Sequence, residues 1–315
     1  AVPSTACSER TLFAESGATS DVRCSSTAGR RLTSDLTTTS LPRSLRKRLR
    51  SASRCSLWTT AGSERETTQA RLAELGAECF VLDDGWFGER SDDTSSLGDW
   101  IPNRKKLGGG LDAVAKLCRE NGMSFGIWVE PEMVSQNSEL YRAHPDWCIH
   151  TEGRAQSLAR SQYMLDMSRP EVRDNVFEQM YAVLSENNID YVKWDFNRNF
   201  TEASSSALSA DRQGEFAHRY MLGTYELFDR LTKAFPDLLI ESCSGGGGRF
   251  DAGMLYYSPQ IWASDNTDAI DRLSIQFGTS MVYPASSMGA HVSAAARTPF
   301  ATRAETSLET AVGRL

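Results

Sequence analysis

The sequence predicts an α/β protein built around a (β/α)8, TIM-type barrel. From about residue 70 onward, short apolar stretches alternate with amphipathic segments, which is typical of repeated βα units and a parallel sheet. Almost every apolar stretch ends in a polar, reactive residue. An open doubly wound sheet collects ligands at one crevice, whereas a barrel brings all its strand ends to one face. The pattern therefore favours the barrel, with the open sheet as the alternative.

Seven parallel strands are expected, with their carboxyl ends on one face of the barrel. They span residues 78–84, 123–130, 162–166, 189–195, 237–242, 260–265 and 280–286. Helical segments separate them, among them LDAVAKLCREN and RPEVRDNVFEQMYAVLSEN, in which Pro170 suits a first helical turn.

Three segments are expected along the chain. Residues 1–70 hold scattered Ser, Thr and Arg without a sustained period of 2 or 3.6, so little stable structure is predicted there. Residues 71–293 form the catalytic barrel, and residues 294–315 form a C-terminal helical segment.

Composition excludes several classes of protein. The net charge is −7, and no run approaches the roughly 18 to 20 apolar residues of a spanning helix, so no membrane association is expected. A basic run at residues 43–54 lacks interleaved aromatic residues, which favours a solvated tail over a nucleic-acid site. The 7 cysteines are odd in number and lack CxxC spacing, which indicates reduced thiols. Without a recognisable signal segment, a cytoplasmic location is expected.

Carboxylates stand at the ends of the expected strands, where a closed barrel would bring them together. Such a ring suits either a metal ion or the hydroxyl groups of a sugar. The 4 histidines include no HxH pair at a strand end, and Lys and Arg beside the acids would repel a divalent cation. We therefore expect no metal and no cofactor. The strand-end acids are Asp83, Asp84, Glu130, Asp166, Asp195, Glu241 and Asp265.

Two of these acids fit the roles that a glycosidase needs. Its carboxyl groups flank the scissile bond, about 5 to 5.5 Å apart when one attacks the sugar. Lys193 and Asp195 face the same way along a strand, so the lysine charge lowers the pKa of the Asp195 carboxyl and favours an anionic nucleophile. Asp265 or Asp268 is placed to be the general acid, although an Asp after a strand is also often a helix cap.

Simpler interpretations exist for single residues. Trp86, Trp100 and Trp128 could be core residues, although the alternation of acids and aromatics at strand ends favours a carbohydrate subsite. Cys243 has no paired His in its segment, which argues against a thiol nucleophile. The glycines at 245–248 lack the Lys and Ser/Thr of a phosphate loop and better suit close packing against a sugar ring.

Several segments together form a specific pattern in both order and spacing. They are FVLDDGWFGERSDDTSSLGDW, FGIWVEPEMVS, LYRAHPDW, YVKWDFNRNF, ESCSGGGGRFDAGMLYY, WASDNTDAIDRLSIQFGTS and YPASSMGAHVS. On these segments, from about residue 75 to about 293, the chain resembles glycoside hydrolase family 36, the bacterial-type α-galactosidases, whose fold is a (β/α) barrel.

The resemblance implies a retaining α-galactosidase that hydrolyses terminal α-galactosides such as melibiose and raffinose-type oligosaccharides. It implies Asp195 as the nucleophile and Asp265 as the acid/base, and full-length relatives that are homo-oligomeric. SLARSQ lacks the glycine that usually precedes the family's arginine at position 160. The implied substrate contacts are Asp83, Asp84, Trp128, Arg160, Lys193, Cys243 and Gly245.

The chain departs from the family at both ends. Family members are usually longer, with a β-rich domain before the barrel and a smaller one after it. The first barrel strand is represented only by CSLWTTAG around Trp58, and the match stops at His291. We therefore expect a barrel that is incomplete at its first strand and its C-terminal end. The alternative functions are an inactive fragment, a sugar-binding protein with the same pocket, and a galactosyl transferase of the raffinose-synthase type.

Overall fold

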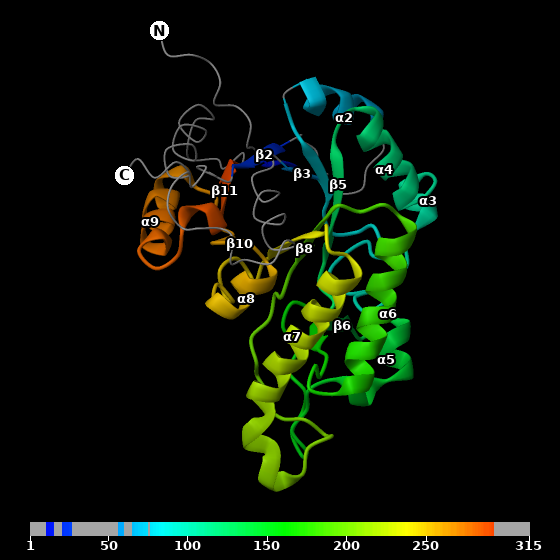
Figure 1. The fold of residues 1–315 in the computed structure, drawn as a ribbon. Helices are drawn as coiled ribbons and strands as arrows, with labels where there is room; N and C mark the ends of the chain where they lie inside the picture. Colours follow the sequence, from blue (N-terminus) through cyan, green and yellow to red (C-terminus); the bar gives the residue numbers. More distant parts are fainter. Residues whose placement is uncertain (1–10, 16–20, 27–55, 60–64, 75, 293–315) are drawn as a thin grey trace.

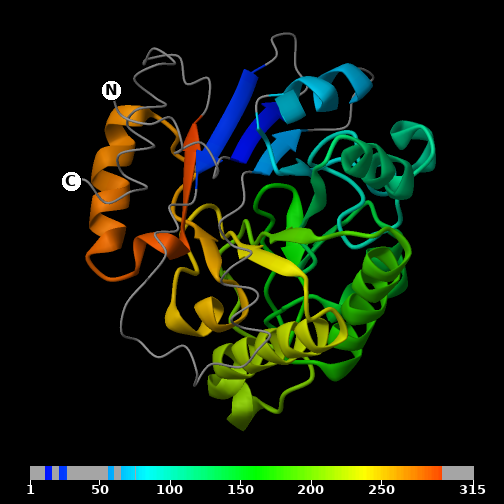
Figure 2. The ribbon, with the colours of Figure 1, turned by 45° about the horizontal axis from the view of Figure 1, so that its top comes forward.

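The computed structural model describes residues 11–15, 21–26, 56–59, 65–74 and 76–292, and within them the strands form a closed barrel. The strand order around the barrel is β1-β2-β11-β10-β9-β8-β5-β4-β3. Figure 2 shows these strands at the centre and the helices around them. The strand bounds are β1 Thr11–Glu15, β2 Asp21–Ser26, β3 Ser56–Thr59, β4 Cys79–Leu82, β5 Ser124–Val129, β8 Tyr191–Trp194, β9 Leu239–Ser242, β10 Gln260–Trp262 and β11 Met288–Val292.

The part of the barrel that runs from β3 to β11 is parallel throughout. Each neighbouring pair, from β3–β4 to β10–β11, is a parallel pair. The predicted (β/α) barrel class is thereby confirmed, and five of the seven expected strands correspond to β4, β5, β8, β9 and β10. The regular βα part alone is incomplete, as expected, and the hairpin of β1 and β2 closes the ring, with β2 antiparallel to both β1 and β11.

The strand expected at 162–166 does not belong to the barrel. β7 (Gln162–Met164) pairs antiparallel with β6 (Met133–Ser135) in a separate two-stranded sheet. In the barrel, β5 pairs directly with β8. The prediction was wrong here because a short apolar run shows that a strand forms but does not show which strand it pairs with.

The strand expected at 280–286 was also misplaced. Helix α9 (Ala269–Ser280) continues into this segment, a 3-10 turn follows at Ala285–Ser287, and the strand is β11. The apolar residues that suggested a strand, Met281 and Val282, are exposed. A short apolar run cannot by itself distinguish a strand from the end of a helix.

The segment expected to lack structure, residues 1–70, contributes three described strands, β1, β2 and β3. Helix α2 (Arg65–Glu74) runs across the expected boundary at residue 70. The remaining residues of this segment, and the segment 294–315, lie outside the described residues.

The barrel strands β4, β8, β9 and β10 are buried along their whole length, because helices cover their outer side (Figure 1). None of the helices between residues 65 and 292 combines the length and apolar character that a transmembrane segment needs. The remaining helices are α3 Arg104–Leu107, α4 Leu111–Glu120, α5 Glu139–Ala143, α6 Pro170–Glu186, α7 Phe216–Ala234 and α8 Ala252–Tyr257, with 3-10 turns at Pro145–Trp147 and Ala210–Glu215.

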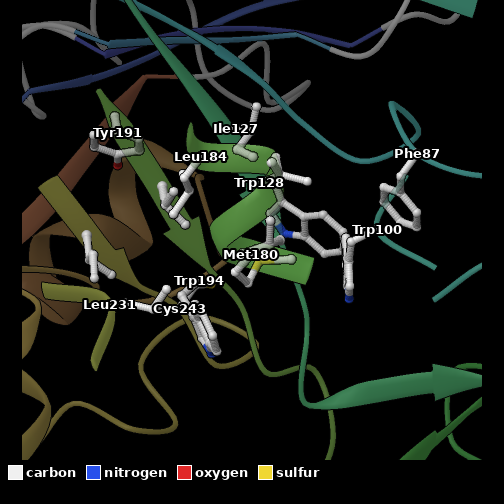
Figure 3. Packing of buried hydrophobic residues seen from close by; sticks show 14 of the residues in the cluster. Phe87, Trp100, Ile127, Trp128, Met180, Leu184, Tyr191, Trp194, Leu231 and Cys243 are labelled. Carbon is white, nitrogen blue, oxygen red and sulfur yellow. The ribbon is translucent and has the colours of Figure 1, made fainter. Parts of the chain in front are cut away.

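An aromatic cluster packs beside the ends of β4 and β5. The Phe87 and Trp100 rings lie with centroids 4.4 Å apart, and Trp128 stacks on Phe87 at 6.4 Å. The Trp86 indole donates a hydrogen bond to the carbonyl of Trp128 at 2.8 Å. Figure 3 shows the Trp128 ring between the end of β5 and Trp100. The tryptophans are therefore core residues, and Trp128 in addition reaches the site described next.

Candidate active site

The strand-end residues identified from the sequence gather on one face of the barrel, except Asp166, which follows β7 outside the barrel. Because β4, β5, β8, β9 and β10 are parallel and consecutive around the barrel, the residues that follow them lie at the same end. Asp83, Glu130, Asp195, Cys243 and Asp265 come after these five strands in that order.

Asp195, the expected nucleophile, is 6% exposed, and three nitrogen atoms donate hydrogen bonds to it. Trp128 Nε1 donates to Oδ2 at 3.0 Å and Asn197 Nδ2 donates to the same oxygen at 2.6 Å. The backbone N–H of Phe196 donates to Oδ1 at 2.8 Å. These bonds fix the carboxylate in one orientation.

The Asp195 carboxyl is kept ionised despite its burial. Burial alone would raise its pKa, but the charge of Lys193 and the hydrogen bonds from Trp128, Asn197 and the Cys243 thiol outweigh it, so the pKa lies below its usual range. The sequence-based expectation of a low pKa next to Lys193 agrees with this direction.

Lys193 is the cation at the centre of the site. It is buried, and its Nζ lies 4.0 Å from the centroid of the Trp262 ring. Burial lowers the pKa of Lys193. Electrostatic interactions with Asp83, Cys243, Asp195 and Glu241 raise it by more than burial lowers it, so the pKa lies above its usual value. Lys193 therefore stays protonated.

Asp83 and Asp84 follow β4 and are held differently. Asp84 accepts a forked hydrogen bond from Arg90, with Nε at 3.0 Å from Oδ1 and Nη2 at 2.8 Å from Oδ2. Asp83 accepts the backbone N–H of Asp84 at 2.9 Å. Burial raises the pKa of Asp83, and Lys193 opposes this. Asp83 is thus directed toward Lys193, while Asp84 is anchored by the buried Arg90.

Asp265, the expected acid/base, lies in an exposed loop after β10. Its charge raises the pKa of the Cys243 thiol, which burial and the charge of Asp195 also raise. The charges of both carboxylates therefore act on the same thiol. Asp268, the alternative acid, caps helix α9: its side chain accepts the N–H groups of Ile270 at 3.1 Å and Asp271 at 3.3 Å.

The Gly-rich loop after β9 forms another part of the site wall. Cys243 is buried, and its N–H donates to the carbonyl of Trp194 at 2.8 Å. Gly245 is exposed with φ of +52°, a conformation that favours glycine, and a Cβ there would lie 3.8 Å from Asn197 Oδ1. The loop therefore places its backbone beside the residues that follow Asp195.

Arg160 is exposed and has a positive φ of +52°. Its charge lowers the pKa of the Glu130 carboxyl, which indicates that its guanidinium lies near the end of β5. Eight of the nine residues expected to form the site thus lie at or just after the ends of the parallel strands, and the charge of Arg160 acts on Glu130 from an exposed position.

Glu130 is a member of this site to which the sequence assigned no role. It is 2% exposed, and its Oε1 accepts Gln162 Nε2 at 2.8 Å and the N–H of Asn197 at 2.6 Å. Burial, with the charge of Asp195, raises its pKa to about 8, although its hydrogen bonds and Arg160 act in the opposite direction. Glu130 therefore supports Asn197, which in turn holds Asp195.

Asn197 and Glu241 were also missed as site residues. Asn197 lies two residues after Asp195, so the alternation of side chains could have placed it beside the nucleophile. The Glu241 carboxyl is buried on β9 and accepts a hydrogen bond from Gln260; burial raises its pKa to about 6, and Lys193 opposes the rise. That Glu241 lies beside Lys193 could be known only from the register of the barrel, in which these two residues pair across β8 and β9.

A known protein family and several curated proteins are similar to this chain. The Melibiase family matches residues 64–313. The α-galactosidase AgaA of Geobacillus stearothermophilus is 64% identical over 222 residues, which cover 70% of this chain and 30% of AgaA. Alpha-galactosidase 1 of Pediococcus pentosaceus is 57% identical over 220 residues, covering 70% of this chain and 30% of that protein. The chain thus spans about a third of the length of these relatives.

Several solved structures of α-galactosidases have a similar fold. The crystal structure of the GH36 α-galactosidase AgaA has a TM-score of 0.75 and 57% identity, covering 77% of this chain and 35% of that one. The α-galactosidase of Lactobacillus brevis has a TM-score of 0.76 and 44% identity, covering 83% and 37%. A variant of AgaA in complex with raffinose matches with a TM-score of 0.75 and 57% identity, covering 77% and 34%.

Proposed function

The chain belongs to the Melibiase family, and from this premise we propose that it is the catalytic part of an α-galactosidase that cleaves terminal α-galactosides with retention of configuration. The substrates are melibiose and raffinose-type oligosaccharides. The names of the relatives and the raffinose complex of one structural neighbour support this substrate class.

The observation that carries the proposal is the difference between the two carboxylates around Cys243. Asp195 is buried and kept ionised by Lys193 and its donors, whereas Asp265 is exposed. A retaining glycosidase needs one carboxylate that remains a nucleophile and one carboxyl that gives and takes a proton. The two environments match these two needs.

The reaction proceeds in two displacements. An Asp195 oxygen attacks the anomeric carbon while the bond to the leaving oxygen breaks, and Asp265 gives its proton to that oxygen. The product is a galactosyl ester of Asp195. In the second step Asp265 takes a proton from water, the water oxygen attacks the anomeric carbon, and Asp195 leaves as a carboxylate.

The remaining site residues hold the galactose. Asp83, Asp84 and Lys193 offer charged acceptors and a donor for ring hydroxyls, and the Trp128 ring provides an apolar wall. The other proposed contacts are Arg160, Cys243 and Gly245. Among the described residues, the buried thiols of Cys118, Cys148 and Cys243 form no disulfide, which supports a cytoplasmic location. We propose that the full-length protein is a homo-oligomer.

A single assay tests this function against its alternatives. The chain is incubated with a nitrophenyl α-galactoside, melibiose and raffinose, and the anomer first released is followed by NMR. Release of α-galactose supports the proposal, and release of β-galactose contradicts the retaining mechanism. Oligosaccharide products in place of free galactose indicate a transferase. Saturable binding of galactose without turnover indicates a sugar-binding protein, and neither turnover nor binding indicates an inactive fragment.

A further inference from the structure

Helix α9 buries two long polar side chains beside the small Ala269, whereas two large apolar side chains of the helix are exposed. Arg272 is fully buried, and Gln276 is buried beside it. In contrast, Ile270 is 59% and Phe277 51% exposed on the same helix. An ordinary amphipathic helix would have the opposite arrangement. The buried guanidinium must therefore serve a purpose other than packing of the helix.

The contacts of Arg272 show what it holds. Its Nη1 donates to the carbonyl of Ser264 at 3.0 Å and to the carbonyl of Asn266 at 3.3 Å. These two carbonyls lie directly before and after Asp265 in the chain. Its Nη2 donates to the carbonyl of Gly289 on β11 at 2.9 Å, and its Nε donates to Gln276 Oε1 at 3.2 Å. One side chain thus ties both sides of Asp265 to the next strand.

The opposite side of the same loop is closed by the Gly-rich loop. Gly246 has a φ of +87°, and a Cβ at this position would lie 2.7 Å from the backbone nitrogen of Asp265 and 2.7 Å from Ser264 Cα. Any larger residue at position 246 would displace the loop. The backbone of Asp265 is therefore enclosed between Gly246 and Arg272.

Burial of the arginine is energetically unfavourable, which argues that these contacts are needed. Burial lowers the pKa of Arg272 to about 10, although the charge of Asp265 acts in the opposite direction. A buried charge is retained where its hydrogen bonds compensate for the lost hydration. Here the bonds run to backbone carbonyls around one exposed carboxylate.

We propose that Arg272 is a positioning residue, which fixes Asp265 at the distance required for proton transfer by holding the carbonyls of Ser264 and Asn266. The inference rests on the proposed glycosidase function for its catalytic consequence. Its structural part, the clamp on the loop after β10, is independent of turnover.

The test uses Arg272→Met, which removes all donors, and Arg272→Lys, which keeps the charge and part of the hydrogen bonding. The control is Arg173→Met on α6. Arg173 is also largely buried and donates to a backbone carbonyl, that of Met167 at 2.9 Å, and pairs with Glu226. Thermal unfolding shows whether each variant is folded, and Arg272→Lys keeps the test decisive if Arg272→Met is not.

The first measurement is deuterium uptake by mass spectrometry without ligand. We expect faster uptake in peptides that cover residues 263–268 of both Arg272 variants, with residues 191–197 unchanged, and no change in 263–268 for Arg173→Met. Unchanged uptake in 263–268, or an equal rise in both segments, would overturn the clamp. The deuterium exchange measurement tests the contact of Arg272 with the loop even if the unmodified chain cleaves no galactoside. Absence of cleavage by the unmodified chain would contradict only the proposed function.

The second measurement is turnover across leaving groups. Misplacement of Asp265 should lower kcat/KM for melibiose by about 10²-fold, while a dinitrophenyl α-galactoside, which needs little protonation, keeps its first step nearly unchanged. Azide should restore turnover of the aryl substrate, and Arg272→Lys should recover part of the loss. An equal loss on all substrates without azide rescue indicates a general structural defect and overturns the inference.

Discussion

The ends of β8 and β10 each present a carboxylate, and the protein holds them in opposite ways. At the end of β8 the side chain of Asp195 is buried and accepts hydrogen bonds from Trp128 and Asn197. At the end of β10 the side chain of Asp265 is exposed, and the protein holds the neighbouring backbone through Arg272. One carboxylate is fixed by its oxygen atoms and the other by its peptide groups.

The difference matches the two roles that we propose for these carboxylates. A nucleophile works best as an anion in a fixed orientation, so its oxygen atoms can be surrounded by donors. A group that releases and accepts a proton in each cycle must remain free to change its protonation state. When the backbone is fixed and the carboxylate is exposed, the group is held in position and can still exchange a proton.

The largest effect is expected at the end of β8. Asp195→Ala should lower turnover of every α-galactoside by roughly 10⁴-fold or more, because no ester can form. Steady-state kinetics with an aryl galactoside and melibiose measures this loss. With azide added, NMR should show a β-galactosyl azide, formed by a single inversion. An α product would contradict the assignment of Asp195.

Asp265→Ala should slow the cleavage of some substrates much more than that of others and should not remove all activity. Loss of the acid should slow melibiose cleavage by roughly 10²-fold to 10⁴-fold, whereas an activated aryl galactoside still reacts with Asp195 and gives a burst followed by slow release. Stopped-flow kinetics detects the burst, and azide should yield the α-galactosyl azide. If Asp268→Ala gives this behaviour in its place, the acid/base lies on α9.

Lys193→Met tests the charge balance around Asp195. Without the cation the pKa of Asp195 and that of Asp83 should rise. We expect kcat/KM to fall roughly 10²-fold and the acidic limb of the pH profile to move to higher pH. Lys233→Met, on the exposed end of α7, serves as the control and should leave the profile unchanged. An unmoved acidic limb in Lys193→Met would show that Lys193 does not set the Asp195 charge.

Glu130, which supports Asn197 after β8, should make the free energy of unfolding depend on pH. Its pKa is 4.5 in the unfolded chain and about 8 in the folded protein, so the folded state holds one more proton between these values. The stabilisation of the folded state that results is complete below about pH 4.5 and is lost as the pH rises to about 8. The free energy of unfolding falls by at most about 1.4 kcal/mol per pH unit in this range. In Glu130→Gln the free energy of unfolding should lack this decline. Urea titrations from pH 5 to 9 measure it, and parallel curves for both proteins would contradict it.

The smallest effect is expected for Asp268→Ala. Loss of the N-cap of α9 should lower the free energy of unfolding by about 1 kcal/mol, because the N–H groups of Ile270 and Asp271 lose their acceptor. The ratio of aryl galactoside to melibiose turnover should stay that of the unmodified protein. Asp268→Asn, which can still cap the helix, should recover most of the stability.

The sequence was sufficient for the class of fold, and it named most of the residues that lie around the candidate site. Alternating apolar and amphipathic segments predicted a parallel barrel, and strand-end acids predicted the face on which the site lies. The sequence failed where pairing matters: 162–166 pairs with β6 outside the barrel, and 281–282 follows a helix instead of forming a strand. Local periodicity describes a segment, but the partner of a strand depends on the whole sheet.

By itself, the sequence predicted which residues would carry the chemistry, because Lys193 and Asp195 share a strand face and Asp265 follows another strand end. The tertiary structure decided how those residues are held. Glu130 lies 67 residues before Asn197, and Arg272 binds the loop around Asp265 from the following helix. Hydrogen bonds to backbone atoms such as these leave no pattern in the sequence. The tertiary structure also decided that Asp268 caps a helix and that Asp265 is an exposed carboxylate, because burial depends on what packs around each residue.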